Sequence, residues 1–323
     1  MHSGFACSKW VENQTGTRDD PICANAVGPM TSGSSFPPAI QGALWMTAQA
    51  ATFSAMVAAV RYLSPYYSAF EIVFFRSIIG LVFQAPWAIG GGWRTILNAR
   101  WPLVLIRSLF NFSGSAVWFI ALGMMVISDA VALQFTLPLF AITGAWLILR
   151  EHVGVKRWIG AAVGFAGAMV IIRPGFIEIP PAALIALSAA ALFAGVHLST
   201  KKLAGSITGN ALIFHANIIA IPLSLVFAAP DWVMPATGHY PALIAVGLFG
   251  TVAHVFMERA YRAADASYIA PTDFSKLLFA ALYGWFLFDE SSDALTWIGA
   301  AIIVAGTTYT TRHEVRATSE HSP

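Results

Sequence analysis

Ionisable side chains inside long apolar segments are the residues of this sequence with types and spacing suited to chemistry. A charge within the hydrocarbon of a membrane is costly, so such residues usually bind something or pair with one another. Asp273 and Lys276 stand three positions apart in one such segment. Residues at this spacing meet on one face of a helix. We therefore predict an ion pair that takes part in substrate binding or coupling, by exchanging with a charged or zwitterionic ligand.

Further polar side chains lie in three other apolar segments. Arg107 and Asn111 are four positions apart, as are His254 and Glu258, so each pair shares one helix face. We expect Arg76, Arg107, Asn111 and His254 to contact substrate or a coupling ion. For the two arginines the alternative is bonding to backbone carbonyls or snorkelling to the surface. For Glu258 the alternative is a surface pair with a neighbouring arginine.

Aromatic, amide and acidic side chains complete the candidate set. Trp118, Gln134 and Tyr283 could line a cavity and stack a planar ligand, although ordinary helix packing explains each of them as well. Four glutamates near segment ends are candidates for gating or for structural capping, and they are Glu71, Glu151, Glu258 and Glu290.

Enzymatic motifs are lacking in the sequence. The spacing from His254 to Glu258 is H-x-x-x-E, which is too weak for a metal site, and neither an H-E-x-x-H motif nor a nucleophile elbow occurs. The two cysteines, Cys7 and Cys23, form no C-x-x-C motif. We expect no catalytic residues, metal or cofactor. A membrane-embedded enzyme and a non-transporting receptor stay open as alternative classes.

The elements that position these residues must lie in lipid. Hydrophobic residues make up 57% of the 323 residues and charged residues only 11%, against about 25% charged in soluble domains. The mean hydropathy is +0.68. A net charge of +2 gives no reason to expect nucleic acid. The lipid bilayer is therefore the expected partner.

Ten apolar segments are long enough, or nearly so, to cross the hydrocarbon layer as helices. Strands of a membrane barrel would need only about 10 alternating residues, so an all-α membrane protein with ten transmembrane helices is predicted. The segments are 39–61, 67–88, 102–123, 128–149, 156–173, 181–200, 210–229, 241–262, 268–288 and 294–311.

Basic residues predict the orientation of these segments. With the N-terminus inside, thirteen Lys and Arg residues fall on the cytoplasmic side and only Arg61 and Arg173 on the other. We therefore expect a multi-pass protein of the bacterial inner membrane with both termini in the cytoplasm. Residues 1–36 are polar and are expected to form a disordered tail, and residues 313–323 a second tail.

An internal repeat divides the chain. Residues 157–162 recur as 296–301, an offset of 139 positions that also aligns Glu151 with Glu290. Five predicted spans separate the two copies, so the halves, 37–175 and 176–312, must be inverted in the membrane. Inverted repeats are typical of secondary transporters with a substrate site between the halves.

Two sets of short motifs resemble the EamA family of the drug/metabolite transporter superfamily. The first set is at 137–139, 150–151, 157–160 and 164–167, and its second copy is at 289–290 and 297–299. The resemblance implies two five-helix repeats that carry a small polar metabolite by alternating access. Whether the chain forms a homodimer stays open from the sequence. Residues 70–76, 106–108 and 265–271 look similar to the branch of S-adenosylmethionine uptake carriers, with riboflavin carriers nearby. Export of amino acids or drugs is the alternative direction.

Overall fold

Helices form the regular secondary structure of this protein in a computed structural model that describes residues 37–92, 96, 100–150, 154–172, 180–203, 206–264 and 272–319. No strand occurs within those ranges, which confirms the all-helical class there. The reason is physical: in lipid a helix satisfies its backbone N–H and C=O groups within its own segment.

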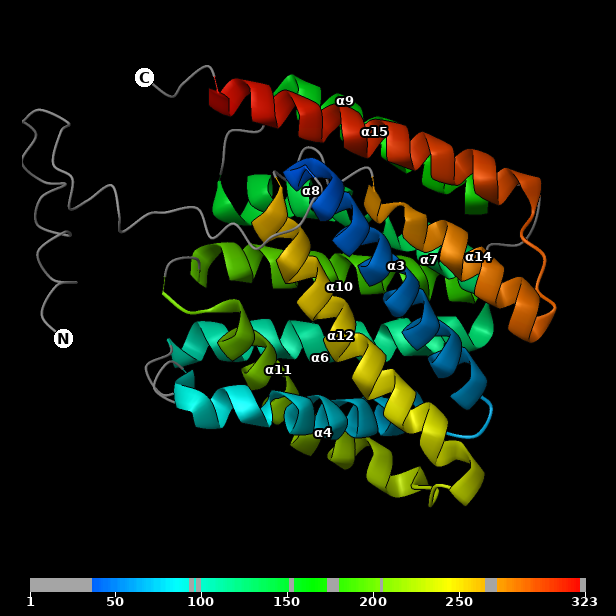
Figure 1. Cartoon of the computed structure of the whole chain (residues 1–323). Helices are drawn as coiled ribbons and strands as arrows, with labels where there is room; N and C mark the ends of the chain where they lie inside the picture. Colours follow the sequence, from blue (N-terminus) through cyan, green and yellow to red (C-terminus); the bar gives the residue numbers. More distant parts are fainter. Residues whose placement is uncertain are drawn as a thin grey trace, which may run out of the picture. The chain divides into compact units, whose positions relative to one another are not determined.

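The helices follow the predicted segments closely (Figure 1). The first half contains α3 (Pro38–Leu63), α4 (Ala69–Trp87), α6 (Trp101–Met124), α7 (Ile127–Gln134), α8 (Leu137–Leu149) and α9 (Val155–Ile172). The second half contains α10 (Pro181–Leu203), α11 (Gly209–Ala228), α12 (Tyr240–Ala263), α14 (Ser275–Phe288) and α15 (Ala294–Ser319). A π turn, Ala88–Gly92, extends α4, and two 3-10 turns, Ala229–Asp231 and Thr237–His239, precede α12.

Seven stretches of helix in the described residues are long and apolar enough to cross a membrane. Three shorter apolar helices, Trp158–Ile172, Ser275–Phe288 and Ala294–Gly306, match the remaining predicted segments. The count of ten spans stays a prediction. The fourth span is interrupted between α7 and α8, where Pro138 lacks the N–H that would bond to the carbonyl of Gln134.

Contacts between the halves come in matched sets. The offset of about 139 positions pairs α3 with α10, α4 with α11, α6 with α12 and α9 with α15. Helix α12 packs along α3 as α10 packs along α6, and α12 meets α4 as α11 meets α6. The equivalent helices α9 and α15 lie side by side (Figure 1). The sequence repeat is therefore also a repeat in packing.

The same symmetry extends to single backbone conformations. Among the described non-glycine residues only Arg150 and Asp289 have positive φ, at 54° and 55°, and they are separated by the repeat offset. Each caps the helix before it: the N–H of Arg150 donates to the carbonyl of Ala145, and that of Asp289 donates to Gly284. The turns after α8 and α14 are thus equivalent.

Glycines bring α9 and α15 together. A Cβ atom on Gly167 would lie 2.6 Å from the carbonyl oxygen of Gly299, and one on Gly306 would lie 2.7 Å from that of Gly160. These two contacts are related by the repeat. Only glycine allows backbones to approach this closely, so these glycines serve the packing of the two helices.

Contacts between helix ends at one face show the relative direction of the helices in the two halves. The hydroxyl of Tyr67, just before α4, is 2.8 Å from Nδ1 of His239, just before α12. The carboxylate of Glu71 in α4 accepts from the N–H of Val233 between α11 and α12. The start of the second helix of one half thus lies beside the start of the third helix of the other, as inverted repeats require.

Candidate functional site

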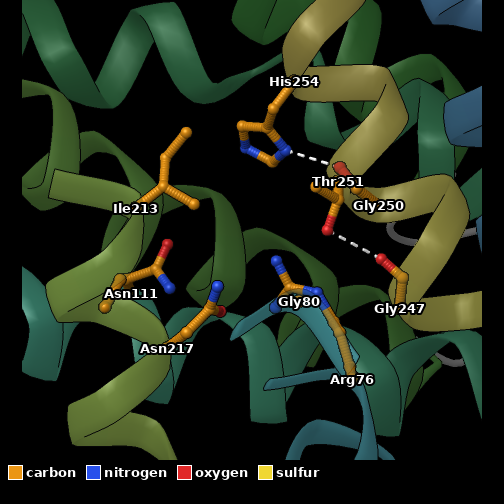
Figure 2. Close-up of a pocket in the computed structure, with 10 residues that line it drawn as sticks. Arg76, Gly80, Asn111, Ile213, Asn217, Gly247, Gly250, Thr251 and His254 are labelled. Atoms are coloured by element: carbon orange, nitrogen blue, oxygen red, sulfur yellow. Dashed lines mark hydrogen bonds between the residues drawn. The ribbon is translucent and has the colours of Figure 1, made fainter. Parts of the chain in front are cut away.

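A hollow between the two halves collects the polar side chains. Its volume is about 370 Å³ with its open mouth included, and α4, α6, α11 and α12 enclose it. We call it the polar hollow, and Figure 2 shows the side chains around it. Its lining residues are Arg76, Gly80, Asn111, Ile213, Ala216, Asn217, Gly247, Gly250, Thr251 and His254.

Arg76 supplies a positive charge to the polar hollow. Its guanidinium reaches Ser115, where Nη1 and Oγ are 3.3 Å apart. Among the described residues that line the hollow there is neither an aspartate nor a glutamate. A buried arginine without a carboxylate partner keeps most of its five N–H donors for other acceptors.

His254 supplies an acceptor. Its Nδ1 is 2.7 Å from the carbonyl oxygen of Gly250, and because a carbonyl only accepts, Nδ1 must carry the proton. The neutral ring then has a free lone pair on Nε2, and Figure 2 shows this nitrogen on the side of the ring that faces the hollow.

Two carboxamides, Asn111 and Asn217, point into the same space from the wall opposite α12 (Figure 2). Asn217 is 7% exposed. It fits because position 80 is a glycine: a Cβ atom there would lie 2.9 Å from Nδ2 of Asn217. The hydroxyl of Thr251 donates to the carbonyl of Gly247 and leaves its oxygen as a further acceptor.

The hollow combines donors and acceptors under a positive potential. Besides Arg76, the charges of Arg107 and Lys276 also act on His254. Such a site can bind a neutral or anionic polar group by several hydrogen bonds at once, and it disfavours a net cation.

Arg107 does not line the hollow, although it is one turn from Asn111. Its Nε donates to Oγ1 of Thr200 at 2.9 Å and its Nη1 to the carbonyl of Leu212 at 3.0 Å. It therefore ties α6 to α10 and α11. Carbonyl bonding, the alternative stated for the arginines, is what the structure shows here.

Asp273 and Lys276 form the predicted ion pair, with 2.5 Å between Nζ and Oδ1. The ammonium lies 5.2 Å from the ring centre of Phe53 in α3. The neighbouring Ser54 donates its hydroxyl to the backbone carbonyl of Lys276 at 3.0 Å. The pair thus lies against α3 and is separate from the lining of the hollow.

The acidic candidates have structural partners. Glu71 is fully buried and forms a capping box with Ser68 at the start of α4. Glu258 pairs with Arg262 one turn away, and both side chains are exposed, at 42% and 76%. Glu290 pairs with Arg61. Glu151 lies outside the described residues.

None of the aromatic and amide candidates is among the residues that line the polar hollow. Trp118 is 2% exposed, and its Nε1 has no hydrogen-bond partner in the described part of the chain. Tyr283 packs against the main core. Gln134 is the last residue of α7. Their assignment to substrate stays a prediction.

Asn217 and Thr251 are site residues that sequence reasoning missed. Asn217 had a usable signal, because it is an amide within the apolar segment 210–229. Thr251 had none, since threonines are common in membrane helices. No group of three or more possible metal ligands occurs among the residues that could be searched.

Comparisons with known proteins agree with this architecture. The EamA-like transporter family matches residues 40–173 and 180–312. A riboflavin transporter of Vibrio cholerae is 32% identical, with 86% of this chain and 95% of that protein covered. An S-adenosylmethionine uptake transporter of Rickettsia prowazekii is 27% identical over 87% and 95%. A pseudopaline exporter of Pseudomonas aeruginosa is 30% identical over 78% and 89%.

A solved structure supports the fold alone. One crystal structure superposes with a TM-score of 0.55 at 16% identity, covering 84% of this chain and 95% of that one.

Proposed function

Because the chain belongs to the EamA-like transporter family and is a small-metabolite transporter, we propose that it takes up riboflavin, or a heterocycle with the same polar edge, across the bacterial inner membrane. Transport proceeds by alternating access through ten spans, with both termini in the cytoplasm and the halves bounded at 37–175 and 176–312.

The polar hollow is the observation that supports this substrate. The isoalloxazine ring of riboflavin is uncharged and presents two carbonyl acceptors on either side of one N–H donor. Arg76, Asn111 and Asn217 offer donors, and Nε2 of His254 offers an acceptor, within one space. Matching donors to acceptors matters here because a buried polar group left unpaired is costly.

S-adenosylmethionine is the second candidate. At neutral pH it carries a sulfonium, an ammonium and one carboxylate, and so a net positive charge. The positive potential of the hollow disfavours such a ligand, and the relatives of this name are less similar than the riboflavin transporters. In its favour, Asp273 is an acid within the membrane that could receive a cation.

Alternating access rests on the matched contacts between the halves. The hollow is enclosed by two helices of one half and their equivalents in the other. Rocking of the halves around such a site opens it to either face. A homodimer would be seen as twice the mass of the chain in detergent.

Uptake into cells tests the proposal. In a bacterial strain that neither makes nor imports riboflavin, the protein should support growth on low riboflavin and saturable uptake of the labelled vitamin. Excess S-adenosylmethionine should not compete, and Arg76→Gln should reduce uptake at least tenfold. Accumulation only in inverted vesicles would make the protein an exporter, and competition by S-adenosylmethionine alone would favour the second candidate.

A further inference from the structure

The Asp273–Lys276 ion pair sits where the helix of the ninth span is interrupted. Asp273 is helical, Phe274 forms a turn, and α14 begins at Ser275. The 14 residues of α14 rise roughly 21 Å between this turn and the loop that holds Glu290. With α14 as part of the predicted ninth span, we expect the pair to lie within the hydrocarbon layer, and the side chains of Asp273 and Lys276 are 31% and 16% exposed.

The ion pair occurs in only one of the two repeats. The offset of 139 positions places Asp273 opposite Gln134, and Lys276 opposite Leu137. The intervening residues Phe135 and Phe274 are also equivalent, and their rings touch with centroids 4.8 Å apart. The two interrupted spans thus meet between the halves, and only the second carries charged residues at the break itself. The interruption itself does not require an ion pair, because α7 and α8 form the equivalent break without one.

The pair is placed to affect the polar hollow. The charge of Lys276 acts on His254, which lines the hollow, and on His197 in α10. The contacts with Phe53 and Ser54 fix the pair against α3. A change in the charge of Asp273 would free the ammonium of Lys276 and raise the positive potential at the hollow.

Other charged and titratable groups around Asp273 are few. From α12 the hydroxyl of Tyr261 interacts with its charge. On α3 the described ionisable residues are Arg61, which is held by Glu290 at the far end of the helix, and the neighbouring Tyr62. On α7 it is Asp129, which accepts from Thr296. Arg107 on α6 interacts with the histidines near Lys276.

We propose that Asp273 is a proton-binding site that couples transport to the proton gradient, an inference that rests on the proposed uptake function. A proton from water at the extracytoplasmic face forms an O–H bond on the carboxylate, and the ion pair with Lys276 opens. When the site faces the cytoplasm, that O–H bond breaks, the proton leaves to water, and the ion pair forms again. One proton enters with each cycle, and no other reactant is needed.

Two assays on purified protein in liposomes separate coupling from binding. In the first, an imposed gradient with the outside acidic drives accumulation of labelled riboflavin. In the second, riboflavin counterflow is measured at equal pH, where no net proton movement is required. Asp273→Asn should lose gradient-driven accumulation at least tenfold and keep counterflow within about twofold. Asp289→Asn, which changes an exposed acid in a loop, should match the wild type in both assays.

A double variant guards against misfolding. Asp273→Asn leaves Lys276 unpaired in the membrane, which is itself destabilising. If that variant does not insert, Asp273→Asn with Lys276→Gln carries no unpaired charge and is expected to show the same split between the assays.

Other results would overturn the inference. Normal gradient-driven accumulation by the variants places coupling elsewhere, and loss of both activities by a folded variant makes Asp273 a substrate contact. If the wild type shows riboflavin counterflow but no response to the proton gradient, the coupling inference is refuted and the proposed uptake function is not. Absence of riboflavin counterflow refutes the proposed substrate instead, and the same variants are then compared with labelled S-adenosylmethionine.

Discussion

Arg61 and Glu290 lie 229 positions apart in the chain and form an ion pair 3.1 Å long. Arg61 also donates to the carbonyls of Leu122 and Gly123 at the end of α6, and Glu290 accepts from the N–H of Ile127 at the start of α7. The cation thus caps a C-terminus and the carboxylate an N-terminus, as helix dipoles favour. The pair fastens the two halves at one face.

Loss of this carboxylate should destabilise the protein. Glu290→Ala leaves Arg61 unpaired at 27% exposure and removes the acceptor for the N–H of Ile127. We expect a loss of about 3 kcal/mol, as for a partly buried pair with one partner removed, measured by denaturant unfolding in detergent. Glu258→Ala, at an exposed pair, is the control and should cost under about 0.5 kcal/mol. Equal losses would contradict the difference in burial.

The same pair should restrict access from its face. In a background with Cys7→Ser and Cys23→Ser, Thr251→Cys places a thiol in the polar hollow. Glu290→Gln should make this thiol react several-fold faster with an impermeant reagent added to whole cells, and riboflavin should protect it. The reaction of Ser291→Cys, in an exposed loop, should not change with Glu290→Gln. An unchanged rate at position 251 would limit Glu290 to a structural role.

The carboxamides of the hollow should determine substrate affinity. Asn111→Ala and Asn217→Ala each remove one hydrogen-bonding group, and we expect KM for riboflavin to rise about tenfold, which corresponds to about 1.4 kcal/mol. Asn210→Ala lies on the same helix as Asn217 but two turns away and outside the lining, so its KM should stay within twofold. Equal effects at positions 210 and 217 would argue against the hollow as the binding site.

The glycine contacts between α9 and α15 should tolerate no side chain. Gly167→Ala and Gly306→Ala each direct a methyl group at a carbonyl oxygen less than 3 Å away, and overpacking of this kind costs about 1–3 kcal/mol. A lower Tm in detergent is the expected result for both. Gly209→Ala, where a Cβ atom meets nothing within 4 Å, should leave Tm unchanged or slightly higher.

Thiol labelling should establish the orientation. We expect Cys7 and Cys23 to react with an impermeant reagent only in inverted vesicles, because the tail is predicted to be cytoplasmic. In a background without them, Ser291→Cys should react in whole cells and Ser206→Cys in inverted vesicles, since the predicted topology places the loop after α14 outside and the loop after α10 in the cytoplasm. Reaction of positions 206 and 291 from the same side would refute the inverted topology.

Sequence reasoning was most successful where a property belongs to one helix. Apolar length predicted the helices, and polarity within apolar segments identified Arg76, Asn111 and His254, which the structure brings to one hollow. The spacing of Asp273 and Lys276 predicted their ion pair. These predictions succeeded because helical geometry relates residues three or four positions apart.

Relations between helices were beyond the same reasoning. The spacing of Arg107 and Asn111 places both on one face of α6. In the structure Arg107 nevertheless bonds to α10 and α11, while Asn111 lines the polar hollow. Asn217 became a site residue only because Gly80 of another helix leaves room for its amide.

The sequence by itself determined that this chain is a membrane protein built of helices with a repeat of 139 positions, because composition and period are properties of the chain. Only the tertiary structure decided that Arg61 meets Glu290, that Phe135 meets Phe274 and that four helices enclose the polar hollow. Such contacts depend on how whole helices rotate and cross, and packing between helices, not spacing along one of them, sets those angles.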